Sequence, residues 1–85
     1  MDTDDWFDAL AAALAEVAPE GSDGPVLSDA ERDGLLDLAR VAAHTAERWT
    51  APVSTFLAGV VLAELPSERR AAAIRAVVET LEPTP

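Results

Sequence analysis

Residues 28–52, SDAERDGLLDLARVAAHTAERWTAP, decide the fold of this chain. They open on a capping box, in which the Ser28 hydroxyl and the Glu31 carboxylate each bind a backbone N–H that the first helical turn leaves free. Apolar residues then recur at spacings of three and four, which is the helical period: Leu35, Leu38, Ala42, Ala46 and Trp49. A proline at position 52 is tolerated only in the first turn of a new helix. We therefore predict a helix over 28–49 and a second one from residue 52.

The residues on either side extend this pattern into three further helices, over about 4–18, 52–65 and 67–81. Trp6, Leu10, Leu14 and Val17 trace one apolar face of the first helix, and Pro19 ends it. Residues 19–27 are rich in Gly, Pro and Asp and predict a flexible loop. On the last helix we expect Ile74, Val77, Val78 and Leu81 to face inward, and residues 82–85 to form an extended tail.

The 52–65 helix is apolar almost all round, so we expect it to be central and surrounded by the others. Gly59 in its middle costs about 1 kcal/mol relative to Ala. We expect a close approach by the Ala-rich side of the first helix to compensate for it. Short connections favour antiparallel neighbours. The sequence therefore predicts an all-α, compact antiparallel bundle of about four helices, forming one domain over residues 1–85.

The composition restricts the classes of function. The chain has 85 residues, no cysteine and a net charge of −10, and its 6 basic residues are all Arg. The missing cysteines exclude disulfides and thiolate metal sites. The negative charge opposes binding to nucleic acid and to anionic membranes. The acidic N-terminus is unlike a signal peptide, and no apolar stretch approaches the ~20 residues of a membrane span. We therefore expect a cytoplasmic protein.

The residue types also argue against catalysis. The chain has one His and neither Cys, Tyr nor Lys, and it contains no glycine-rich phosphate loop. His44 and Glu47 have the i, i+3 spacing of a shared metal ligand pair, but a di-metal bundle needs that motif twice. We predict no catalytic residue, no metal site and no cofactor.

One face of the 28–49 helix carries the candidate site. Arg40, His44 and Arg48 are spaced by four and concentrate positive charge in an acidic chain, with Asp37 and Glu47 beside them. With the N-terminus of the following helix, which favours anions, they could hold a phosphate or an acidic group of a partner. The same residues could instead form an ion-pair network along an exposed helix. The residues alone favour the network, and the binding interpretation stays open.

Three stretches resemble a known family: LLDLARVAAHTAER at 35–48, APVSTFLAG at 51–59 and DWF at 5–7. They are similar to a small uncharacterised domain of actinobacterial-type genomes. That domain occurs alone or fused to the molybdenum cofactor guanylyltransferase, a molybdopterin-guanine dinucleotide biosynthesis protein A-like enzyme. The resemblance implies a role in maturing or delivering molybdopterin guanine dinucleotide, or in serving a molybdoenzyme. It also gives weight to Asp37, Arg40, His44, Glu47 and Pro52, which carry the match.

Taken with this resemblance, the sequence predicts a non-catalytic accessory domain that docks on a molybdenum cofactor guanylyltransferase or a molybdoenzyme. The predicted binding residues are Asp37, Arg40, His44, Glu47 and Arg48. Two alternatives remain: a self-associating helical module, motivated by the small size and the apolar 52–65 helix, and a binder of a small phosphate-bearing ligand. An exposed tryptophan at position 6 or 49 would indicate an interface.

Overall fold

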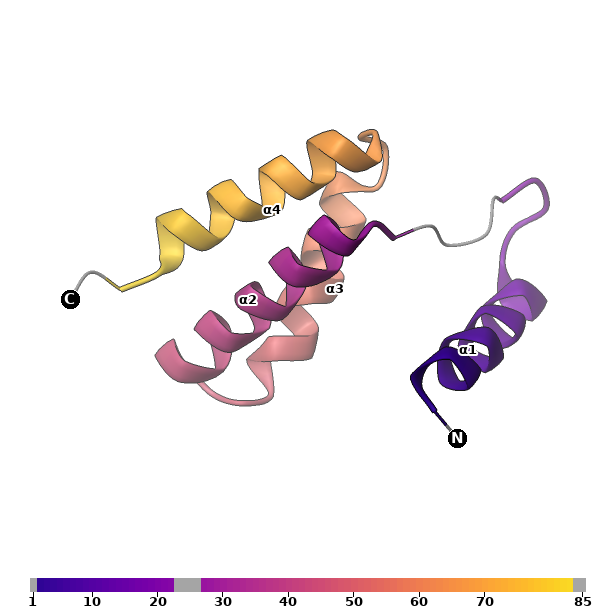
Figure 1. Cartoon of the computed structure of the whole chain (residues 1–85), viewed down its shortest axis with the longest axis horizontal. Coiled ribbons are helices and arrows are strands. Elements are labelled where there is room, and N and C mark those ends of the chain that lie inside the picture. The colour runs from indigo at the N-terminus through magenta and orange to yellow at the C-terminus, as the bar shows by residue number, and fades with distance from the viewer. Residues whose placement is uncertain (1, 23–26, 84–85) are drawn as a thin grey trace.

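The computed structural model describes residues 2–22 and 27–83 and contains four α-helices: α1 (Thr3–Val17), α2 (Asp29–Thr45), α3 (Thr50–Leu62) and α4 (Ser67–Leu81) (Figure 1). The predicted all-α helical bundle is confirmed, and the described residues contain no strand. Parts of the predicted loop (23–26) and tail (84–85) lie outside the described residues. Residues 19–22 form a turn, which the Ser22 N–H closes on the Pro19 carbonyl at 3.1 Å, with Gly21 at a φ of 81°.

The start of α2 has the predicted capping box, and α1 also begins at a side-chain cap. The Ser28 hydroxyl accepts the Glu31 N–H at 3.1 Å, and the Glu31 carboxylate accepts the Ser28 N–H at 3.3 Å, so the capping box is present. At the start of α1, the Asp2 carboxylate accepts the Asp5 N–H at 2.8 Å. Both caps satisfy backbone donors that the first helical turn leaves unpaired.

The junction between α2 and α3 differs from the prediction. The second helix ends at Thr45 rather than Trp49, and the third begins at Thr50 and ends at Leu62 rather than Leu65. Thr50 is the first residue of α3 but gives the start of that helix no side-chain cap. Its hydroxyl instead donates to the Glu47 carbonyl at 2.6 Å and to the Ala42 carbonyl at 3.2 Å. These bonds add to the ones that the same carbonyls accept from the backbone N–H groups of Thr50 and Ala46, and they hold the turn that reverses the chain.

The core is small and is centred on α2, which packs against both α3 and α4, whereas α3 and α4 meet each other far less. The buried core consists of Leu38 and Val41 from α2 and Ile74 and Val78 from α4. Helices α2 and α4 approach closely at Gly34, where an added Cβ would lie 2.9 Å from the Ile74 methyl group. The prediction that the third helix is central is wrong, because α3 contributes no fully buried residue.

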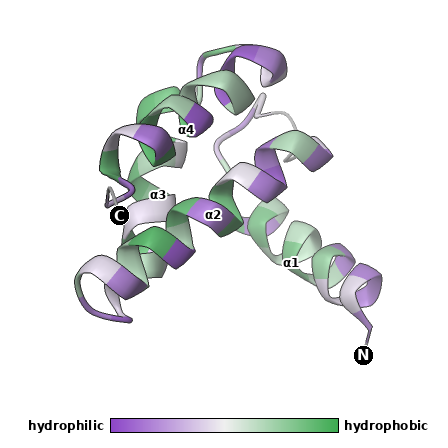
Figure 2. Cartoon of the chain, turned by 60° about the vertical axis from the view of Figure 1, so that its left-hand side comes forward, coloured by the Kyte–Doolittle hydropathy of each residue, from purple (hydrophilic) through white to green (hydrophobic). Residues whose placement is uncertain are grey.

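Helix α1 packs on none of the other helices and stands apart from them (Figures 1 and 2). Its apolar face is exposed, including Trp6, Leu10, Leu14 and Val17. The expected contact of the first helix with Gly59 does not form, and no side chain lies within 4 Å of a Cβ placed there. The close helix approach that a glycine permits occurs at Gly34 instead.

Candidate interaction site

Two of the predicted site residues, Asp37 and Arg40, form ion pairs with α4. One Arg40 nitrogen donates to Glu82 at 2.8 Å, and another lies 3.7 Å from Asp37. Asp37 also accepts a hydrogen bond from Arg75 at 2.7 Å. The bond from Arg75 holds the pKa of Asp37 below its usual value, and the bond to Glu82 raises the pKa of Arg40. The Arg40–Asp37 pair runs along α2, as in the ion-pair network that the sequence left open. The other contacts tie α2 to the α4 side instead.

The other three predicted residues, His44, Glu47 and Arg48, lie in the last turn of α2 and the turn that follows it. All three are exposed, and within residues 2–22 and 27–83 their side chains make no ion pair. Trp49 follows them directly and exposes 68% of its surface. We call these four residues the α2–α3 corner. The predicted site is thus divided between an ion-paired half and an open half.

The first N–H groups of α3 are already hydrogen-bonded and are not free to bind an anion. The Thr50 N–H donates to the Glu47 carbonyl at 3.0 Å, and the Ala51 N–H donates to the Arg48 carbonyl at 3.2 Å. Pro52 has no N–H to offer. A phosphate at this helix end would have to displace backbone hydrogen bonds, because anion sites at helix starts depend on free N–H groups.

A buried ion pair that sequence reasoning missed joins the starts of α2 and α4. The Glu31 side chain is only 3% exposed, and it accepts hydrogen bonds from Arg70 at 2.7 and 3.1 Å. The Ser67 hydroxyl donates to the same carboxylate, and Arg70 also donates to the Leu65 carbonyl at 2.9 Å. The bonds from Arg70 outweigh the effect of burial and lower the pKa of Glu31 from 4.5 to about 2.

A sequence signal for this pair does exist. Arg70 precedes Ile74 by four and Val78 by eight residues, so it lies on the row of α4 that faces the core. A cation in such a row needs a buried partner, because unpaired buried charges are very costly. Glu31 was assigned only its capping role, which it performs together with the ion pair.

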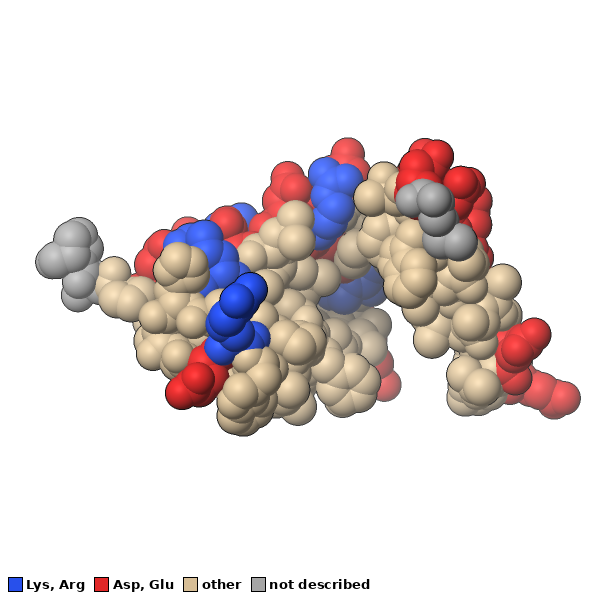
Figure 3. Space-filling view, turned by 90° about the horizontal axis from the view of Figure 1, so that it is seen from below, with Lys and Arg blue, Asp and Glu red and all other residues tan. Residues whose placement is uncertain are grey.

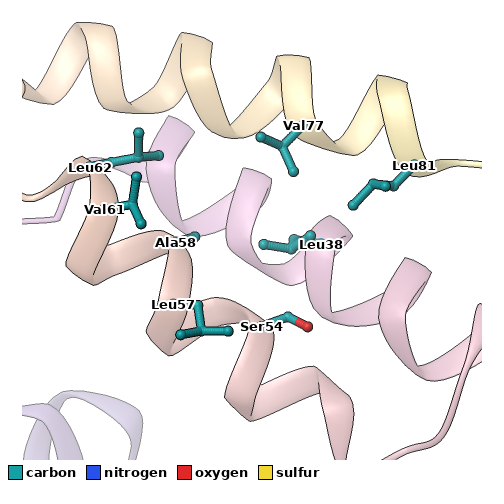
Figure 4. A pocket seen from close by; sticks show the side chains of 8 residues that line it. All are labelled: Leu38, Ser54, Leu57, Ala58, Val61, Leu62, Val77 and Leu81. Atoms are coloured by element: carbon teal, nitrogen blue, oxygen red, sulfur yellow. The ribbon is translucent and has the colours of Figure 1, made fainter.

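An apolar groove lies between α3 and α4 (Figure 4). Its volume is about 330 Å³. Leu38 of α2 lies at its floor, with Leu57 and Val61 on the α3 side and Val77 and Leu81 on the α4 side. We call this surface the α3–α4 groove. It is open because α3 and α4 each pack on α2 and contact each other little.

The basic residues are confined to one part of the chain. Helix α1 has acidic side chains and no basic residue, whereas the part formed by α2 to α4 holds the six arginines together with further acidic residues. Figure 3 shows arginines and acidic side chains side by side on that part. The described residues contain no group of three His, Asp or Glu side chains placed to hold a metal. In the ranges 2–22 and 27–83, every helix is too short or too polar to cross a bilayer.

These features define a small all-α protein in which α3 and α4 pack on α2 and the described residues leave apolar surfaces open. The chain belongs to the family described as Domain of unknown function (DUF6457), whose model matches residues 1–84. Neither the curated proteins nor the solved structures gave a match. The family match carries no link to a molybdenum cofactor enzyme or to actinobacteria, so that part of the resemblance stays a prediction.

Proposed function

We propose that this protein is a non-catalytic interaction domain that docks on a protein partner through the α2–α3 corner. The observation that carries the proposal is the exposed Trp49, beside Arg48, whose charge is not used within the described chain. Tryptophan and arginine dominate the hot spots of protein interfaces. A Trp in a turn that contributes nothing to its own core is typical of an anchor that fills a pocket on a partner.

The chemistry of the corner indicates what the partner offers. Trp49 requires an apolar pocket, and Arg48 requires a carboxylate at the rim of that pocket. His44 and Glu47, on either side, can orient these contacts. Asp37 and Arg40 remain paired with α4 and hold the end of α2 in place. They therefore support the corner rather than contact the partner.

On the identity of the partner, the proposal follows the sequence resemblance. Of the stretches that carry that resemblance, the one at 35–48 contains three of the four corner residues, and the one at 51–59 begins two residues after Trp49. We propose a molybdenum cofactor guanylyltransferase or a molybdoenzyme as the partner. The domain would then act as an accessory in the synthesis or delivery of molybdopterin guanine dinucleotide, with no reacting group of its own.

Co-purification from the native host with corner variants tests this proposal. Tagged wild-type protein should recover a molybdenum cofactor guanylyltransferase or a molybdoenzyme, and Trp49→Ala and Arg48→Glu should each lose it. Arg32→Glu is the matched control, because Arg32 is exposed and its ion pairs within the described part of the chain are with Asp29 and Asp33 of its own turn. Equal recovery by all four proteins, or no molybdenum-related protein with any of them, would overturn the proposal.

A further inference from the structure

Two apolar surfaces have no partner among the described residues of this chain, and they are separate from the α2–α3 corner. The first is the face of α1, where Trp6 and Phe7 expose 54% and 56% of their surfaces and Val17 exposes 80%. The second is the α3–α4 groove, where Leu57 and Val61 expose 55% and 77%. Large exposed apolar patches on a small protein mark interaction surfaces.

The placement of charge indicates which surfaces pair. Helix α1 carries Asp4, Asp5, Asp8 and Glu16 and no basic residue, and helical spacing puts these acids on the side away from its apolar face. They therefore stay in water when the apolar face packs on another surface. Helix α3 carries no charged residue, so the wall of the groove that it forms has no charge to bury. Pairing two α1 faces would leave both grooves open, whereas pairing α1 with the groove covers both apolar surfaces of each copy. In the structure α1 does not occupy the groove of its own chain.

We propose that α1 of one copy packs into the α3–α4 groove of a second copy, and that α1 of the second copy packs into the α3–α4 groove of the first. This is an exchange of identical elements with two-fold symmetry, a low-cost route to a dimer. Each copy then covers both of its open apolar surfaces. The inference is independent of the proposed function, because the α2–α3 corner remains outside the contact.

The area available is sufficient for such a dimer. A buried aromatic side chain covers about 150–250 Å² and a buried Leu or Val roughly 60–120 Å². At the exposures of these residues, the α1 face offers on the order of 400 Å² and the groove on the order of 250 Å². Two reciprocal contacts would bury about 1,300 Å² in total, at the lower end of the range for stable interfaces.

The oligomeric state of the full chain, with α1 variants, tests the proposal. Sedimentation equilibrium should give twice the 8.9 kDa chain mass at high concentration. Leu14→Glu should raise the dimer dissociation constant roughly tenfold or more, because it buries a charge in the apolar contact. Its helical content should not change, since α1 packs on no other helix of its chain. Ala12→Glu, on the opposite face of α1, is the matched control and should stay dimeric.

A crosslinking experiment distinguishes exchange from docking of α1 in its own groove. The chain has no cysteine, so single cysteines report specific contacts. A copy carrying Val17→Cys is mixed with a size-tagged copy carrying Val61→Cys and then oxidised. Exchange predicts a disulfide between the two copies. A monomer at all concentrations, a dimer that Leu14→Glu leaves intact, or no mixed disulfide would each overturn the proposal.

Discussion

Replacing Glu31 with Gln removes the charge of the one buried ion pair among the described residues while keeping the size of the side chain. Glu31 accepts hydrogen bonds from Arg70, from Ser67 and from the Ser28 backbone, and these contacts join the start of α2 to the start of α4. A glutamine retains one acceptor oxygen but leaves the Arg70 guanidinium without its counter-charge. We therefore expect Glu31→Gln to destabilise the fold well beyond the loss of a surface pair.

The magnitude follows from the pKa of Glu31, which falls from 4.5 to about 2 on folding. Each tenfold change in proton affinity is worth about 1.4 kcal/mol, so the fall corresponds to at most about 3 kcal/mol. Solvent near the helix ends screens part of this, and we expect a loss of about 2–3 kcal/mol at pH 7. For a chain of this length the total stability is roughly 4–13 kcal/mol, so the loss is a large fraction.

Urea unfolding followed by circular dichroism, repeated between pH 7 and pH 2, measures this effect. Because the folded-state pKa of Glu31 is lowered, its contribution is fully present above about pH 4.5 and is lost as the pH falls towards 2. The wild-type protein should therefore lose stability over that range. Glu31→Gln should lose less, and the difference between the two proteins should shrink as the pH falls.

Arg70→Met separates the charge effect from the packing effect. It leaves an ionised carboxylate buried without its cation, so the pKa of Glu31 should return towards or above 4.5. The double variant Glu31→Gln with Arg70→Met should be more stable than the sum of the two single losses predicts. Unchanged stability in Glu31→Gln at pH 7, or an identical pH profile in wild type and variant, would refute the assigned role of this pair.

Two further predictions concern the backbone. Gly34→Ala should destabilise the protein by about 1–3 kcal/mol in thermal unfolding, because its Cβ would meet the Ile74 methyl group at 2.9 Å. Gly59→Ala is the matched variant and should stabilise the protein by about 0.5–1 kcal/mol, since no atom lies within 4 Å of the added Cβ and alanine favours the helix. Equal effects of the two glycine substitutions would contradict this packing. Thr50→Val should cost about 1 kcal/mol in urea unfolding, because it leaves the Ala42 and Glu47 carbonyls without the hydroxyl; an unchanged midpoint would show that the hydroxyl does not hold the turn.

The sequence predicted the helices well because their signals are local. The capping box at Ser28 marks the beginning of α2, and the proline before Ser67 marks the beginning of α4. Helix α4 has the predicted bounds. The predicted end of α2, at Trp49, lies four residues after the observed end at Thr45. Its termination depends on the Thr50 hydroxyl, which reaches back to Ala42 across the turn. A contact of that kind is set by the turn geometry, and residue spacing does not reveal it.

The position of the core was harder to predict. The apolar character of 52–65 was read as a sign of a central helix, yet Phe56 and Val60 of α3 remain 69% and 59% exposed. Composition shows that a helix has apolar surface, but not whether its own chain covers that surface. Helix α2 has a more polar composition than α3, yet it is the central helix of the packed part, because its narrow apolar stripe contacts both α3 and α4.

The candidate site was predicted in part. The spacing of Arg40, His44 and Arg48 predicted one polar helix face, but α2 ends at Thr45 and Arg48 lies in the turn that follows it. The spacing could not show that Arg40 pairs with Glu82, because that partner lies at the end of α4, 42 positions away. The exposure of Trp49 could not be predicted from the spacing either, because the residue was assigned to the buried stripe of a longer helix. Because α2 ends at Thr45, Trp49 lies in the turn and is exposed there, which is the basis of the proposed interface.

The central claim, that the α2–α3 corner is the docking surface, is tested most directly by the emission of Trp49. The chain has two tryptophans, so Trp6→Phe leaves Trp49 as its only one, and 7-azatryptophan incorporated at that position can be excited to the red of the tryptophans of an added enzyme. In this variant the emission should shift to the blue when the molybdenum cofactor guanylyltransferase from the same host is added, because the indole leaves water for an apolar pocket. Arg48→Glu in the same background should weaken the shift. Unchanged Trp49 emission at about 100 μM enzyme, where even weak docking would be visible, would contradict the claim.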